Sequence, residues 1–255
     1  MTGFIAVYRR ELTSYFQSAI FYVVALVFLA LFGYLFLAGV LAYNFYSLQA
    51  QNPMIASQLN ATDVVLTPLF HNTSVIMLLV MPLLTMRLFA EERKSGTIEL
   101  LFTFPLRDLG LLFGKLAAVL TVFLIVLLGT LPCIAYLATL TPVDPGVVLT
   151  IYLGLFLLGF SFLSLGVFMS SLTENQIVAA VASFGALLGF WLVGFVGEFS
   201  GAAAGGVLSY ISILEHFDGF TRGVIDTRDV AFYLLFSAFF LFGTLRVLEV
   251  TRWRG

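Results

Sequence analysis

Charged residues are scarce in this chain. Only 10% of its 255 residues are Asp, Glu, Lys or Arg, whereas about 25% is usual in a soluble domain. Hydrophobic residues make up 61% of the sequence, 28 residues are phenylalanine, and the mean hydropathy is +1.07. A water-soluble core of this size could hardly bury so much apolar surface, so the composition predicts a membrane domain.

Cysteine and the common catalytic motifs are also missing. Cys133 is the only cysteine, so the chain forms neither an intramolecular disulfide nor a CxxC-type metal site. The sequence contains no HExxH zinc motif and no GxxxxGK[ST] phosphate-binding loop. We therefore expect no catalytic, cofactor-binding or metal-binding residue in this chain, and no binding of ATP by that route.

Six apolar runs approach or exceed the roughly 20 residues that a helix needs to cross a bilayer. They cover residues 19–43, 72–90, 111–140, 147–169, 177–199 and 230–248. Arg87 and Arg246 lie about one turn inside two of these runs, where a long basic side chain can reach the interface. Pro82 and Pro132 should kink the second and third helices. The sequence predicts an all-α, polytopic membrane protein with six transmembrane helices in one domain, residues 1–255.

None of the six runs has an ionisable residue near its middle; Glu198 lies close to the end of the fifth. Ion-coupled carriers place carboxylates or histidines at depth, and intramembrane hydrolases need a buried base, an aspartate pair or a zinc site. The pattern excludes both classes. A carrier of this kind would need an external source of energy.

Basic residues fall mainly on one side of a six-helix arrangement. Only Arg222 and Arg228 fall on the other side. Because cytoplasmic loops hold the excess of Lys and Arg, both termini are predicted to be cytoplasmic. The ten residues on that side are Arg9, Arg10, Arg87, Arg93, Lys94, Arg107, Lys115, Arg246, Arg252 and Arg254.

Three segments outside the runs have distinct patterns. Residues 1–18 lack the features of a secretory signal and alternate apolar and charged residues at helical spacing, which predicts an amphipathic helix in the interface or, alternatively, a frayed terminus. Residues 44–71 read as a polar outer loop. Residues 200–229 contain a glycine-rich break and an apolar stretch too short to span, which predicts a re-entrant or interfacial helix.

A charged island interrupts the apolar sequence. Seven of the 26 charged residues lie between Glu91 and Asp108. Gly96 should end a helix after Arg93 and Lys94, and residues 97–103 could form a short helix that crosses the loop. Such a crossbar would fit a cleft on a soluble subunit; an ordinary solvated loop is the alternative.

The residues at the outer end of the fifth run and in residues 200–229 form a second candidate site. The carboxylates and histidine of this site could contact an external partner, and three of them could bind a metal ion, although neighbouring residues rarely point at one ion. Interfacial packing explains them equally simply. The candidate residues are Glu198, Glu215, His216 and Asp218, of which the last three are the metal candidates.

The island resembles a known family. EERKSGTIELLFTFPL followed by LLFGK is similar to the first cytoplasmic loop of ABC exporter permeases of the second exporter class, in particular those grouped with the gliding-motility transport system. The segments RRELTSYFQS, PLFHNTSVIMLLVMPLLTMRLFAEE, SSLTENQIVAA and HFDGFTRGVIDTRDV agree with that family in the same order. The likeness covers nearly the whole chain.

The resemblance implies a non-enzymatic permease that works with a separate ABC ATPase subunit, on which ATP and Mg are bound. It implies pairing with a second copy or a sister permease in the inner (cytoplasmic) membrane of a prokaryote, and in some cases an accessory membrane subunit with an external domain; no nucleic acid is involved. Residues 1–18 would be the elbow helix, 91–108 the coupling loop and 200–229 the outer re-entrant segment. The residues implied to couple to the ATPase are Glu91, Glu92, Arg93, Lys94, Gly96, Thr97 and Glu99.

Two other functions compete with the exporter permease. A non-transporting membrane scaffold or assembly factor would also lack buried charge and would dock a partner other than an ATPase. A membrane-embedded enzyme would need catalytic residues that the sequence does not offer. The aromatic-rich bundle suggests an amphipathic or lipid-linked cargo, but phenylalanine is also ordinary lipid-facing filler.

Overall fold

The computed structural model describes residues 2–49, 60–97, 108–199 and 210–254, and all regular structure in these ranges is helical. Six helical segments are long and apolar enough to cross a membrane. Helices are the expected form because backbone groups in lipid must bond within their own segment. The prediction of an all-α fold with six spans is confirmed. The segments are Ala19–Leu48, Thr62–Lys94, Asp108–Leu140, Pro145–Leu172, Gln176–Gly194 and Thr227–Arg252.

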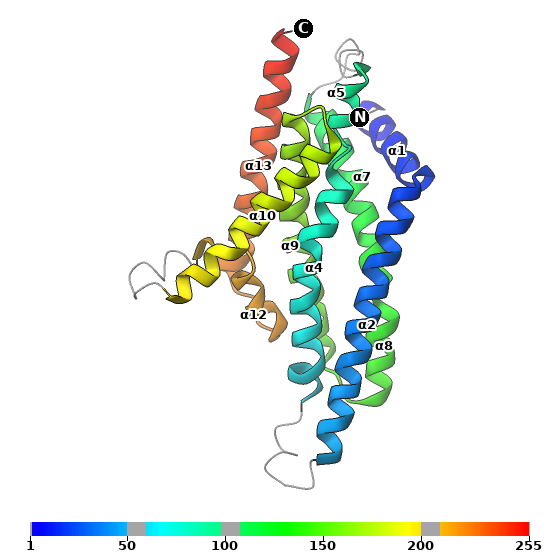
Figure 1. Cartoon of the computed structure of the whole chain (residues 1–255), viewed down its shortest axis with the longest axis vertical. Helices are drawn as coiled ribbons and strands as arrows, with labels where there is room; N and C mark the ends of the chain where they lie inside the picture. Colours follow the sequence, from blue (N-terminus) through cyan, green and yellow to red (C-terminus); the bar gives the residue numbers. More distant parts are fainter. Residues whose placement is uncertain (1, 50–59, 98–107, 200–209, 255) are drawn as a thin grey trace.

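The helices form one elongated bundle (Figure 1). Helix α9 (Pro145–Leu172) packs against α4 (Thr67–Thr85), α10 (Gln176–Phe199) and α13 (Thr227–Arg254) and is largely buried. Both termini and α5 (Ala90–Lys94) lie at one end of the bundle, which we call the α5 end. Helices α2 (Ala19–Gln49) and α8 (Leu131–Leu140) finish at the opposite end.

The predicted outer loop, residues 44–71, is shorter in the structure. Helix α2 continues to Gln49, and a π-helical turn, η1 (Thr62–Leu66), leads directly into α4. The prediction of a loop is therefore wrong at both ends, and only residues 50–59 lie outside the described part. Hydropathy marks where a helix meets lipid, whereas backbone hydrogen bonds continue through polar residues such as Asn44 and Ser47.

The two predicted kinks are interruptions of the helix. Helix α4 ends three residues after Pro82, and the chain turns before α5. Helix α7 (Asp108–Leu128) ends shortly before Pro132, which lies in the first turn of α8. A neighbouring hydroxyl bonds at each break: that of Ser170 to the backbone at the first, and that of Tyr152 to the Thr130 hydroxyl, 2.7 Å away, at the second. Such partners allow proline to break a spanning helix.

Helix α1 (Thr2–Gln17) lies along α7. Its buried stripe consists of Val7, Glu11 and Tyr15, which are four residues apart and therefore share one face. The Tyr15 hydroxyl donates to the Leu84 carbonyl at 2.6 Å. Gly114 makes the close approach possible, because a Cβ atom there would lie 2.9 Å from Val7. One residue in this buried stripe is thus a carboxylate, which needs a partner.

The segment between α10 and α13 packs against the side of the bundle. It contains η2 (Glu215–Phe217) and α12 (Asp218–Thr221), and α12 contacts α9 and α4. In Figure 1, α12 lies partway along the bundle, short of the end where α2 and α8 finish. Residues 200–209 of the predicted re-entrant segment lie outside the described part of the chain.

Candidate functional site

The charged island contains a short helix and a sharp turn at the α5 end. Helix α5 has Arg93 and Lys94 in its last turn, where cations suit the helix dipole. Gly96 follows with a φ of +69°, a left-handed conformation that glycine adopts without strain. The predicted helix stop is confirmed. The predicted crossbar, residues 97–103, and Glu99 lie outside the described residues except for Thr97.

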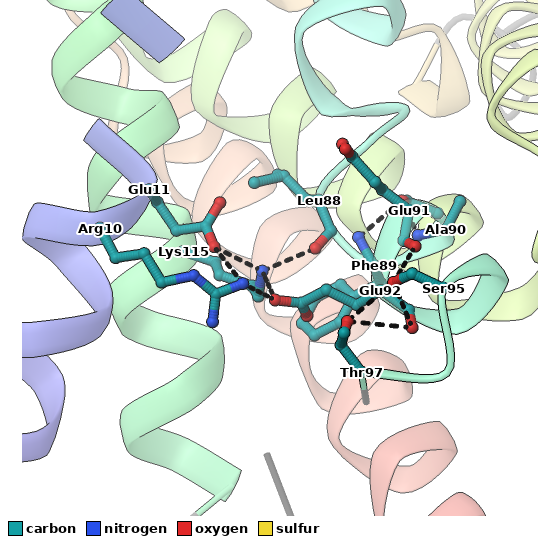
Figure 2. A network of polar contacts seen from close by, with 11 residues as sticks. Arg10, Glu11, Leu88, Phe89, Ala90, Glu91, Glu92, Ser95, Thr97 and Lys115 are labelled. Atoms are coloured by element: carbon teal, nitrogen blue, oxygen red, sulfur yellow. Dashed lines mark hydrogen bonds and ion pairs between the residues drawn. The ribbon is translucent and has the colours of Figure 1, made fainter. Parts of the chain in front are cut away.

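Lys115 of α7 lies at the centre of a buried network behind this turn (Figure 2). Its Nζ atom is 2.8 Å from Glu11 Oε1 and 2.9 Å from Glu92 Oε1. The same ammonium donates to the Leu88 carbonyl at 2.8 Å and lies 5.3 Å from the centre of the Phe89 ring. All three ammonium protons therefore have an oxygen acceptor within reach.

Arg10 completes what we call the ion cluster: Arg10, Glu11, Glu92 and Lys115. Arg10 Nη2 donates to Glu92 Oε1 at 2.8 Å. The Lys115 side chain is 1% exposed and those of Glu11 and Glu92 are 11% and 7% exposed, whereas Arg10 reaches solvent. The four groups together carry no net charge, and the second positive charge is supplied from the exposed edge by Arg10. Removing one member would leave an uncompensated charge in a poorly solvated place.

The ion cluster joins three elements that are distant in the sequence. Arg10 and Glu11 come from α1, Glu92 from α5 and Lys115 from α7. Helix α5 cannot shift without moving these partners or breaking ion pairs.

Two further contacts attach α5 to the bundle. The Ser170 hydroxyl of α9 accepts from the backbone N–H groups of Phe89 and Ala90 at 3.1 and 3.2 Å, and it donates to the Met86 carbonyl at 2.9 Å. Arg93 Nη2 donates to Thr251 Oγ1 of α13 at 2.7 Å. The short helix is therefore bonded to α1, α7, α9 and α13.

The structure divides the predicted coupling residues into two groups. Glu91, Lys94 and Gly96 are exposed, and Arg93 and Thr97 are half-buried. Glu92 is 5% exposed and points into the ion cluster (Figure 2). Glu92 therefore does not share the exposed surface of Glu91, because helical rotation turns adjacent residues by about 100°.

Three members of the ion cluster were not recognised as site residues from the sequence. The signals were present: Lys115 is a single charge inside a predicted span, and Glu11 falls among the apolar residues of a predicted amphipathic helix. Taken separately, Lys115 and Glu11 are each typical of a residue at the membrane interface. Only the packing of α1 on α7 brings Glu11 and Lys115 together.

The outer candidate residues form two groups: Glu215 and Asp218 line one hollow with His71, whereas His216 faces Asp229. His216 is buried, with Nδ1 2.7 Å from Asp229 Oδ1 and Nε2 donating to the Tyr210 carbonyl at 2.9 Å. Asp218 instead lies 3.5 Å from His71 of α4, and Glu215 is exposed. Among the described residues, no three His, Cys, Asp or Glu side chains are placed to hold a metal ion. The side chain of Glu198 lies outside the described part.

The fold and this site define a multi-pass helical membrane protein whose broken second span presents a short, internally bonded helix at one end of the bundle. A family model described as ABC-2 family transporter protein matches residues 46–246, which is most of the chain. The protein belongs to this family and is the membrane permease component of an ABC-2 transporter, a subunit that is typically non-catalytic. The family implies a partner ATPase subunit. No curated protein matches the sequence.

Proposed function

We propose that this chain is the permease of an ABC exporter in which a separate ATPase binds the α5 turn and moves α1 and α7 together with it. The ion cluster is the observation that carries the proposal. Glu92 of α5 shares its carboxylate oxygen between Lys115 of α7 and Arg10 of α1. A force on α5 therefore acts on both neighbours.

The exposed residues of the turn are the proposed contact surface. Glu91 and Lys94 are exposed, and Glu92 is not. ATP-driven closure of two ATPase subunits would pull the α5 turns of two permeases, either two copies or a sister pair, and open a pathway between them. The ion pairs keep their geometry during this motion, because stretching them in a poorly solvated site is costly.

The remaining parts of the assembly follow from the resemblance and from the distribution of charge. We place the α5 end in the cytoplasm of a prokaryotic cell, because the basic residues gather with both termini at that end. Membership of the gliding-motility group, and an accessory subunit with an external domain, rest on the sequence likeness alone. An amphipathic or lipid-linked cargo would suit a span interior without charge.

The test separates docking from transmission. The permease is isolated with its native ATPase, reconstituted in vesicles, and studied in a Cys133→Ala background that carries Ile211→Cys as a reporter, because Ile211 is exposed in the outer segment. We measure ATPase retention and the rate at which an impermeant maleimide labels the reporter, with and without ATP. Glu91→Lys should weaken ATPase association by about tenfold. Glu92→Gln should retain the ATPase and abolish the effect of ATP on labelling.

Glu249→Gln is the matched control, because Glu249 is an exposed carboxylate of α13 that pairs only with Arg246 among the described residues. It should behave as the unmodified chain in both measurements. An unchanged ATPase association in Glu91→Lys would contradict the contact surface. If ATP altered labelling in no variant, the unmodified chain included, the non-transporting scaffold would be the better description.

A further inference from the structure

A polar recess of about 680 Å³ lies where α1 turns into α2. It is open to solvent, and the described residues that line it include no carboxylate. Its walls combine three guanidinium groups with hydroxyl and amide side chains. The lining residues are Arg9, Arg10, Thr13, Ser14, Gln17, Ser18 and Arg87.

The three arginines differ in the interaction partners of their guanidinium groups. Arg10 is bonded to Glu92, so part of its charge is offset. Arg9 is exposed and forms no ion pair with any described residue. Arg87 lies with its guanidinium carbon 4.3 Å from the centre of the Tyr15 ring, and its Nη2 atom is buried with no hydrogen-bond partner among the described residues.

Arg87 forms no ion pair with any described residue, although Glu11, Glu91 and Glu92 line an adjoining hollow with it. The Tyr15 hydroxyl is buried and donates to the Leu84 carbonyl, and burial raises the pKa of Tyr15 despite the nearby guanidinium. The phenol is therefore neutral at physiological pH. A buried donor without an acceptor costs free energy, and an acidic group in the recess would remove that cost.

We propose that this recess binds a phosphate group, and that the phosphate belongs to the headgroup of an anionic membrane lipid. Guanidinium forks and hydroxyl donors are the usual ligands of phosphate oxygens in proteins. Ser18 is the single residue between α1 and the first span, so the recess opens where the chain enters the membrane.

The neighbouring surface suits a lipid better than a free anion. Phe16, Ile20 and Tyr22 lie within four residues of Ser18 in the sequence and are 38%, 47% and 55% exposed. Their apolar surface can contact acyl chains while the headgroup occupies the recess. The site needs neither the ATPase nor a cargo, so its test is independent of the proposed coupling.

The experiment measures lipid retention by the purified chain. Native mass spectrometry compares phosphatidylglycerol with phosphatidylcholine of the same acyl chains, and a third arm adds millimolar inorganic phosphate as competitor. Arg9→Gln and Arg87→Gln remove charges from the recess. Arg246→Gln removes an exposed charge from α13, outside the recess lining, and serves as the matched control.

We expect the unmodified chain to retain phosphatidylglycerol in preference to phosphatidylcholine, and each recess variant to weaken that retention by about fivefold, with little change in Arg246→Gln. An equal loss in all three variants would overturn the site in favour of general surface charge. If millimolar inorganic phosphate displaced the phosphatidylglycerol, the recess would be a site for free phosphate, and the assignment to a lipid would be overturned. If Arg87→Gln does not fold, the exposed Arg9→Gln still carries the test.

Discussion

The ion cluster at the α5 end and the aromatic packing near α12 fix chain segments to the bundle by different means. The ion cluster connects residues 82 and 104 positions apart in the sequence. The outer group, which we call the aromatic cluster (Tyr210, His216, Phe220, Phe232 and Tyr233), connects close neighbours: its hydrogen bonds span 6, 13 and 20 positions. The ion cluster joins helices that are distant in the sequence, whereas the aromatic cluster packs the segment between α10 and α13 against α13.

The physical forces in the two regions differ accordingly. Ion pairs depend strongly on distance and alignment, so a shift of one partner is felt by the others. Aromatic rings gain mainly from buried area and tolerate several orientations: His216 stacks on Phe232 at 4.0 Å, whereas Tyr210 meets His216 edge-on at 5.2 Å. The contacts at the α5 end therefore fix the relative positions of helices, whereas those of the outer segment fill space between side chains.

Lys115→Met should show the largest effect, because it leaves Glu11 and Glu92 buried with only the peripheral Arg10 nearby. We expect a loss of about 3–5 kcal/mol in the free energy of unfolding, measured by thermal unfolding in detergent. Lys94→Met is the control, since Lys94 is exposed on α5 and should change stability little. A similar loss of unfolding free energy in the two variants would contradict a stabilising role of the ion cluster.

Gly154→Ala tests the shape-filling at the aromatic cluster. A Cβ atom at Gly154 of α9 would lie 2.5 Å from Phe220 Cγ, so Phe220 must withdraw. The expected cost is about 2 kcal/mol, together with faster proteolysis within residues 210–226. Gly185→Ala on α10 meets nothing within 4 Å and should be neutral. Equal proteolysis of the two variants would contradict close packing of α12 on α9.

Ser170→Ala should have the smallest of the three effects, about 1 kcal/mol. It removes the neutral bonds that attach the start of α5 to α9 and leaves the ion cluster intact. Ser164→Ala is matched, because Ser164 lies on the same helix and its hydroxyl donates within that helix, to the Phe160 carbonyl. Thermal unfolding compares the two. If Ser170→Ala lowered the free energy of unfolding as much as Lys115→Met, the attachment of α5 would depend on neutral hydrogen bonds and not on the ion cluster.

The spans and the helix stop at Gly96 could be predicted from the sequence because both have local causes. Long apolar runs leave few alternatives to a spanning helix, and glycine after two cations is a common helix end. The extent of α2 could not be predicted in this way, because its last turns include Asn44, Ser47 and Gln49 yet are still helical. The composition of a segment indicates whether it lies in lipid or in water, but it does not indicate where the helix ends.

The ion cluster could not be predicted, because adjacent and chemically identical residues have opposite environments. Glu91 is exposed and Glu92 is buried. The difference depends on where α1 and α7 lie, and a single sequence does not contain that information in a local pattern. The same holds for His216, which turns away from Asp218 to Asp229 because the ring packs on Phe232.

The buried stripe of α1 has a consequence for biosynthesis. Glu11 leaves the ribosome 104 residues before its lysine partner, which is about 5–20 s earlier at common translation rates. Gly114, against which Val7 packs, is translated at nearly the same time as Lys115. Helix α1 is therefore translated before α7 and cannot dock on it until that span has been made.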